Sequence, residues 1–372
     1  IDDIYYTKLY GKSNTKAMRD FHNLYVKMML IKGASQSGFT LIDLAVGKGG
    51  DFPKWIDSKL SFIFGIDLSK DNIENRMDGA CARYLNYKKK FKNMPDALFV
   101  NGNSGLNIKS GEAILSEKEK IITKAVFGMG EKSERAIGKG VVKNYGKGKD
   151  GFDVCSCQFA LHYFFENIVV LSNFIQNVAD STRIGGHFIG TCYDGNLIFN
   201  ELKSVSMGES TSLFKNDHKI WEIIKLYENN EFKDDETSLG YSIDVFQETI
   251  GKSFKEYLVN FTFFKNIMEN YGFVLLSKDE ANALNLPNSS GLFSDLHNHM
   301  QLEAISIKDL KKNIGESLVM SEEEKKISFY NRYFIFRKER NVGNIKLDKS
   351  SPSKIKIKPT NIKKLSKRII IK

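Results

Sequence analysis

A glycine-rich turn follows the first strongly apolar segment of this sequence, in LIDLAVGKGGDFPKW at residues 41–55. Gly47, Gly49 and Gly50 have no side chain, so a ligand can approach the backbone closely there. Asp51 is expected as the N-cap of the helix that follows, with Pro53 in its first turn. The pattern predicts a binding site at the junction of a strand and a helix.

The next apolar segment, FIFGIDL at 62–68, places Asp67 twenty residues after Gly47. A carboxylate at the end of this strand can accept hydrogen bonds from both hydroxyls of an adenosine ribose. The glycine turn and Asp67 together indicate a nucleoside site.

Two classes of cofactor use such a site. A dinucleotide site requires GxGxxG, and Phe52 occupies the place of the third glycine when Gly47 is the first. The methyl-donor pattern DxGxGxG fits better, with only its first glycine replaced, and it consists here of Asp43, Ala45, Gly47 and Gly49. We therefore favour S-adenosylmethionine over a nicotinamide cofactor.

Strands and helices must position these residues. Short apolar segments alternate with longer amphipathic ones along the chain, and this alternation predicts an α/β fold with helices on both faces of a parallel sheet. We expect seven strands in one doubly wound, mostly parallel sheet, at 40–46, 62–68, 97–102, 152–160, 187–193, 272–277 and 328–338. Asp43, Asp67 and Asn103 then lie at the carboxyl ends of three successive strands, which supports the methyl-donor interpretation.

Three further segments are expected around this sheet. A helix over 18–31, within an N-terminal segment of 12–35, is expected to cross the mouth of the sheet. Residues 104–150 are polar and rich in Gly and Lys, which predicts a surface insertion. Residues 202–255 contain KIWEIIKLY and GYSIDVF, which predict inserted antiparallel strands before a helix at about 256–271.

The segment FDVCSCQFALHYFFE at 152–166 resembles the corresponding segment of the mRNA cap guanine-N7 methyltransferases, and so does DLAVGKGGDFPKW. The similarity extends over about 18–338 and includes FIGT at 188–191 and EYLV at 256–259. The long insertion before the fourth strand and YDG in place of a proline turn are most similar to capping enzymes of large cytoplasmic DNA viruses. The resemblance implies a class I Rossmann-like S-adenosylmethionine methyltransferase domain over 1–339, with 202–255 as an inserted cap-binding segment.

The resemblance also implies a site for S-adenosylmethionine, whose product would be S-adenosylhomocysteine. Its residues in this sequence would be Lys27, Asp43, Ala45, Gly47, Asp67, Leu68, Asn103, Gln158 and Tyr163. Asn103 stands where the family usually has Asp. A neutral amide can still donate to or accept from the adenine edge, so we expect weaker charge complementarity rather than loss of binding.

The cap pocket implied by the resemblance consists of Asn23, His162, Tyr163, Glu256 and Tyr333. A carboxylate such as Glu256 can accept hydrogen bonds from N1–H and N2–H of guanine, and an aromatic ring such as Tyr333 can stack on the base, although neighbouring Tyr330 is an alternative. Guanine N7 already has a free lone pair, so in-line methyl displacement requires proximity and electrostatic stabilisation but no general base. We therefore predict no catalytic proton-transfer residue.

Charge is concentrated at the end of the chain. Residues 340–372 carry eleven Lys or Arg and one Asp, a net charge of +10 that equals the formal net charge of all 372 residues. This basic tail could attract RNA or remain a solvated terminus.

Capped RNA is the expected partner. The first residue is Ile, and the resemblance implies a longer polypeptide with triphosphatase and guanylyltransferase domains, with or without a stimulatory subunit, in the host cytoplasm, a viral factory or the virion.

The remaining expectations concern alternatives and absences. The sequence shows no membrane-spanning segment and no metal site, since His297 and His299 have no acidic or Cys partner at ligand spacing and are interpreted as part of a polar loop. One alternative function is a noncatalytic cap-binding or scaffold subunit with a degenerate methyltransferase fold, which the departures at Ala45 and Asn103 would fit. Another is a methyltransferase that acts on a different class of substrate.

Overall fold

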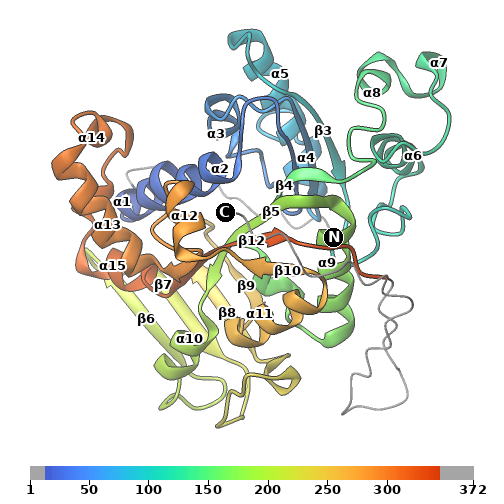
Figure 1. Cartoon of the computed structure of the whole chain (residues 1–372). Helices are drawn as coiled ribbons and strands as arrows, with labels where there is room; N and C mark the ends of the chain where they lie inside the picture. Colours follow the sequence, from blue (N-terminus) through green and yellow to red (C-terminus); the bar gives the residue numbers. More distant parts are fainter. Residues whose placement is uncertain (1–12, 344–372) are drawn as a thin grey trace, which may run out of the picture.

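The computed structural model describes residues 13–343 of the chain, so most of the basic tail lies outside the described residues. Its larger sheet has the strand order β10-β12-β5-β4-β1-β2-β3, with β11 paired to β12 (Figure 1). These strands are β1 (Thr40–Asp43), β2 (Phe62–Asp67), β3 (Asp96–Asn101), β4 (Phe152–Gln158), β5 (Thr182–Tyr193), β10 (Phe273–Leu275), β11 (Ser290–Leu292) and β12 (Asn331–Lys338). The seven predicted strands are confirmed, and β11 is an eighth, short strand that the sequence did not reveal.

Strands β3, β2, β1, β4 and β5 run parallel to one another, and β12 runs antiparallel to β5. This order, with one reversed strand near the edge, is the predicted doubly wound class I Rossmann-like arrangement. Side chains alternate between its two faces, so Leu41 enters one hydrophobic core and Ile42 the other. Both faces are therefore covered, which explains why β2 is buried along its whole length.

Helices cover these faces and occupy the connections. Before residue 202, where the second predicted insertion begins, they are α1 (Lys16–Asp20), η1 (Phe21–Lys27), α2 (Met28–Ala34), α3 (Phe52–Asp57), α4 (Lys70–Glu74), α5 (Ala80–Lys90), α6 (Glu117–Val126), α7 (Glu134–Ile137), α8 (Lys139–Lys143), η2 (Leu161–Phe164), α9 (Ile168–Ser181) and α10 (Gly195–Glu201). Later ones are η3 (Glu236–Ser238), α11 (Phe261–Asn270), α12 (Lys278–Ala283), α13 (Phe293–Ser306), α14 (Leu310–Asn313), η4 (Ser317–Val319) and α15 (Glu322–Ser328). His297 and His299 lie in α13, so their assignment to a polar loop was wrong.

The predicted surface insertion at 104–150 contains three short helices, α6 to α8, which project beside β3 in Figure 1. It is only partly a surface segment. Ile114, Val126 and Phe127 are buried, and the ring of Phe127 packs edge-on against Phe64 of β2. Apolar side chains spaced among the many lysines thus anchor the insertion to the main core.

A second, antiparallel sheet lies beside the first in Figure 1. Its order is β6-β7-β8-β9, with β6 (Ser210–Lys215), β7 (His218–Lys225), β8 (Ser242–Gln247) and β9 (Ser253–Tyr257). The predicted antiparallel strands are confirmed, but the helix expected from Glu256 was placed too early. Glu256 belongs to β9, and α11 begins at Phe261, where Asn260 caps it by accepting from Phe263 N–H.

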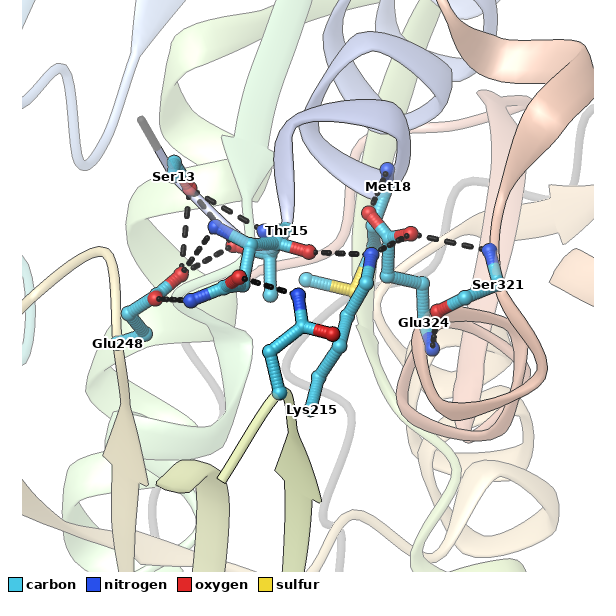
Figure 2. Close-up of polar contacts among 9 residues, drawn as sticks. Ser13, Thr15, Met18, Lys215, Glu248, Ser321 and Glu324 are labelled. Carbon is cyan, nitrogen blue, oxygen red and sulfur yellow. Dashed lines mark hydrogen bonds and ion pairs between the residues drawn. The ribbon is translucent and has the colours of Figure 1, made fainter. Parts of the chain in front are cut away.

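The predicted N-terminal helix extends from Lys16 to Ala34, and its middle part, η1, is a π-helix. Polar contacts fix its start to the antiparallel sheet and to α15 (Figure 2). Glu248 accepts hydrogen bonds from the backbone and side chain of Asn14, and Lys215 donates to Asn14 O and pairs with Glu324. We call this network the N-terminal clamp. It fixes the position of the helix that carries Asn23 and Lys27.

Candidate functional site

The glycine turn lies directly after β1, at the carboxyl edge of the main sheet. Gly47 and Gly49 have φ angles of 56° and 73°, and a Cβ atom on Gly49 would come within 2.4 Å of the Phe52 ring. These two glycines are therefore required by the backbone. Ala45 keeps a negative φ, so the replacement of the first glycine of the motif costs no left-handed strain.

Asp67 connects this turn to the end of β2. Its carboxylate accepts hydrogen bonds from Gly47 N–H at 2.8 Å, Ser69 N–H at 2.9 Å and Asn72 Nδ2 at 3.0 Å. The residue is 9% exposed. Asp67 therefore holds the shape of the turn, a structural role that the sequence prediction of a ribose contact did not include.

A compact group of charges lies beside the turn. Lys27 Nζ and Lys54 Nζ lie 2.8 and 3.0 Å from Asp51 Oδ1. Burial alone would raise the pKa of Asp51, but the two ammonium groups hold it at about 2. Asp51 does occupy the N-cap position of α3, yet its side chain makes no capping hydrogen bond, because it is engaged by the lysines. The prediction therefore gave the correct N-cap position, but the capping hydrogen bond that it implied is not formed.

Asp43 lies at the end of β1 close to this group and accepts a hydrogen bond from Ala45 N–H. Burial and the charge of Asp51 raise the pKa of Asp43 to about 7. A cationic ligand beside this carboxylate would favour its ionised form. The residues present thus fit a ligand with positive charge, as the sulfonium and ammonium groups of S-adenosylmethionine have.

Three other predicted cofactor residues lie around the same edge of the sheet. Leu68 is 70% exposed immediately after β2, where an apolar side chain can contact a base. Asn103 lies just beyond β3 and accepts from Gly105 N–H. Gln158, at the end of β4, is buried between Ser156 and Thr191, to which its amide is hydrogen-bonded. Gln158 is accordingly engaged within the fold.

The sequence did not single out Phe159, which follows β4 with a φ of 52°. Such a conformation costs energy for an aromatic residue, and strained residues of this kind are concentrated at functional sites. Its N–H donates to both the backbone and the hydroxyl of Thr191, and its ring stacks on His22 at 5.2 Å. Only its place within the CSCQF motif could have drawn attention to it.

His162 and Glu256 come together from η2 and β9, with His162 Nε2 at 3.5 Å from Glu256 Oε1. Both side chains are buried, yet Nδ1 and Nε2 of His162 and Oε2 of Glu256 have no hydrogen-bond partner within residues 13–343. Burial lowers the pKa of His162 to about 3 and raises that of Glu256 to about 8. Tyr163 packs edge-on against His162 at 4.2 Å. Buried polar atoms without partners are rare in proteins and point to a polar ligand.

The other two predicted pocket residues are engaged elsewhere. Asn23 Nδ2 donates to Arg19 O, and Lys27, four residues later in the same π-helix, points to Asp51 instead. Tyr333 is 1% exposed, and its hydroxyl donates to Asn288 O. Its role as a stacking surface stays a prediction and requires that the ring become uncovered.

Residues 13–343 contain neither a group of side chains suited to a metal ion nor a helix suited to cross a membrane. No three of the His, Cys, Asp and Glu side chains there are grouped so that they could hold a metal ion. No helix in the same range combines the length and apolar character that a bilayer crossing requires.

Residues 7–339 match the family model described as the mRNA (guanine-N(7))-methyltransferase domain. The probable mRNA-capping enzyme of Acanthamoeba polyphaga mimivirus is 29% identical over 353 residues, which cover 90% of this chain and 28% of that protein. The mRNA cap guanine-N(7) methyltransferase 1 of Arabidopsis thaliana is 28% identical over 258 residues, which cover 68% and 58%.

The solved structure of an S-adenosylmethionine-dependent methyltransferase from Clostridium acetobutylicum has a TM-score of 0.42 and 8% identity, and the match covers 86% of this chain and 91% of that one. The chain spans less than two thirds of the length of the two curated relatives described above.

Proposed function

This chain belongs to the mRNA (guanine-N(7))-methyltransferase family, and on that basis we propose that it transfers the methyl group of S-adenosylmethionine to N7 of the guanosine cap of an mRNA. The observation that carries the choice of substrate is the buried pair of His162 and Glu256. Its unpartnered atoms offer a carboxylate acceptor to a ligand with paired N–H donors. Guanine, with N1–H and N2–H on one edge, is such a ligand.

The cofactor half of the site would consist of the glycine turn, Asp43, Asp67 and Leu68. S-adenosylmethionine supplies an electrophilic methyl group when bound. The backbone of Gly47 and Gly49 admits the ligand, Asp43 provides negative charge, and the exposed Leu68 provides an apolar contact for the adenine. Lys27 and Lys54 neutralise Asp51, which leaves Asp43 as the carboxylate that favours a cation.

The residues of the chain need not move a proton in this reaction, because the attacking N7 is already a lone-pair nucleophile. Their work is to hold the guanine and the methyl donor in line and to exclude water. Glu256 and His162 would fix the base, and Phe159 and Tyr163 would form apolar walls between the two halves of the site. The contribution is positional, so a substitution at Glu256 should act mainly through cap binding.

The test is transfer of a labelled methyl group to RNA that begins with GpppA, compared with GTP and with uncapped RNA. We expect label at guanine N7 only on the capped RNA, and a loss of kcat/KM of at least about 100-fold in Glu256→Ala. Asp244→Ala, in the neighbouring strand β8, is the matched control. Tight cofactor binding without any transfer would instead support a noncatalytic subunit, and transfer to uncapped RNA or a small molecule would support another substrate class.

The mimivirus relative is named a probable mRNA-capping enzyme, which supports capped RNA as the partner and supports a setting within a multidomain capping enzyme. The domain organisation, a stimulatory subunit, and a location in the host cytoplasm, viral factory or virion stay predictions.

A further inference from the structure

Tyr193 is the last residue of β5, where the carboxyl edge of the main sheet meets the antiparallel sheet. It shares a face of β5 with Thr191, which bonds Gln158 and Phe159. The side chain is nearly buried, at 7% exposed. A tyrosine at this junction can contact residues of both sheets.

The hydroxyl of Tyr193 accepts two hydrogen bonds from the antiparallel sheet, one from Trp221 Nε1 at 3.1 Å and one from Gln247 Nε2 at 3.0 Å. A phenolic oxygen has two acceptor sites and one hydrogen, and an indole N–H can only donate. Both acceptor sites are therefore taken. The hydroxyl hydrogen remains to be donated to another group.

Glu256 lies on the same face of the antiparallel sheet as Trp221 and Gln247. In the register of the strands, Trp221 lies opposite Gln247, and Ile243, two pairs further along the same face of β8, lies opposite Glu256. Burial and the nearby charge of Glu256 raise the pKa of Tyr193, which keeps the hydroxyl protonated. The hydroxyl of Tyr193, which has a hydrogen left to donate, thus lies against the face of the antiparallel sheet that also carries the buried acceptor Glu256.

We propose that the Tyr193 hydroxyl donates a hydrogen bond to O6 of the cap guanine, beside the contacts of Glu256 with N1–H and N2–H; this rests on the function proposed above. The Watson–Crick edge of guanine has the order acceptor, donor, donor, which matches a hydroxyl donor followed by a carboxylate. Adenine has an amino donor at position 6. A donor would then face a donor in a buried site, so Tyr193 would also exclude adenine.

The test uses caps that differ by one group. A 6-thioguanosine cap replaces O6 with a weaker acceptor and keeps N1–H and the 2-amino group, whereas an inosine cap keeps O6 and lacks the 2-amino group. Kd values are measured for each cap with wild type, Tyr193→Phe and Tyr227→Phe. Tyr227 is the matched control, because its buried hydroxyl has no hydrogen-bond partner in residues 13–343 and packs near Phe199 and Tyr241.

We expect the wild type to bind the guanosine cap about tenfold more tightly than the 6-thioguanosine cap, and Tyr193→Phe to lose that preference while it keeps the wild-type penalty for inosine. Tyr227→Phe should retain both preferences. If Tyr193 only supported Trp221, its replacement would weaken the binding of all caps equally. An unchanged ratio of the Kd values for the guanosine and 6-thioguanosine caps in Tyr193→Phe would therefore overturn the proposal. A wild type that binds the two caps equally would overturn it without any variant. Failure of the proposed function is distinct, since the wild type would then transfer no methyl group to any cap, whether or not it binds one.

Discussion

His162 Nε2 and Glu256 Oε1 face each other at 3.5 Å inside the protein, and neither side chain completes its hydrogen bonds there. A histidine and a carboxylate at this separation would form an ion pair in water-exposed surroundings. Burial instead favours the neutral form of both, with pKa values of about 3 and about 8. The pair is thus held in a state that a polar ligand would stabilise.

Cap binding should become tighter as the pH rises through about 8. Guanine donates two hydrogen bonds, which the ionised carboxylate of Glu256 accepts and the protonated acid accepts less well. The Kd for a cap dinucleotide, measured by fluorescence quenching from about pH 6.5 to about pH 9, should fall over this range. Glu256→Gln should bind at least about tenfold more weakly and without this pH dependence. A pH-independent Kd in the wild type would contradict the ionisation of Glu256 on binding.

The same substitution should stabilise the fold at alkaline pH. The pKa of Glu256 is raised in the folded state, so its contribution to stability is complete below the ordinary glutamate pKa and is lost as the pH rises through about 8. Glu256→Gln avoids this loss, and at about pH 9 its free energy of unfolding should exceed that of the wild type by up to about 4 kcal/mol. Urea unfolding at about pH 5 and about pH 9 checks this. If the free energy of unfolding differed between Glu256→Gln and the wild type by the same amount at both pH values, a buried, titrating Glu256 would be ruled out.

Asp43 should control the affinity for the methyl donor. Its pKa of about 7 results from burial and from the charge of Asp51, so a cationic ligand must compete with a proton for it near neutral pH. Calorimetry should show S-adenosylmethionine binding that tightens from about pH 6 to about pH 8, and Asp43→Asn should weaken it by about tenfold and remove the pH dependence. Asp57→Asn, on a half-exposed carboxylate that pairs with Lys32, is the control and should bind as the wild type does.

The glycine turn allows a comparison of adjacent positions. Gly49→Ala places a Cβ atom in the left-handed region and 2.4 Å from the Phe52 ring, which should cost about 1–3 kcal/mol of stability and weaken cofactor binding. Gly50→Ala meets no atom within 4 Å and has no positive φ, so it should fold normally. Thermal melting with and without S-adenosylmethionine distinguishes the two. Equal effects would show that the turn rearranges.

The N-terminal clamp should act on local rather than global stability. Glu248 accepts hydrogen bonds from Ser13, Asn14 and Thr15, and Glu248→Ala removes them all. We expect faster hydrogen exchange at residues 13–20 and a higher KM for the cap, with little change in the melting temperature. Glu131→Ala, at an exposed position of the 104–150 insertion, is the control. Unchanged exchange at the clamp would show that the packing of Phe21 and Val26 alone holds the helix.

The sequence by itself determined the features that depend on contiguous residues. The glycine turn, Asp67 at the end of β2 and the strands of the main sheet other than β11 follow from local backbone requirements and apolar periodicity, which neighbouring residues set together. The antiparallel strands near KIWEIIKLY and GYSIDVF were found for the same reason. The helix boundary at Glu256 was missed because a carboxylate before an apolar segment is equally typical of a helix start and of a buried strand residue in need of a partner.

Only the tertiary structure decided which side chains that are distant in the sequence contact one another. Lys27 pairs with Asp51, which the sequence assigned to a helix cap, and Tyr193 receives hydrogen bonds from Trp221 and Gln247. Tyr333 is covered, although an alternating strand could have placed it on either face. Burial and pairing are properties of the packed sheets, since they depend on which strand or helix lies opposite. The shifted pKa of Glu256 therefore required the fold to be known.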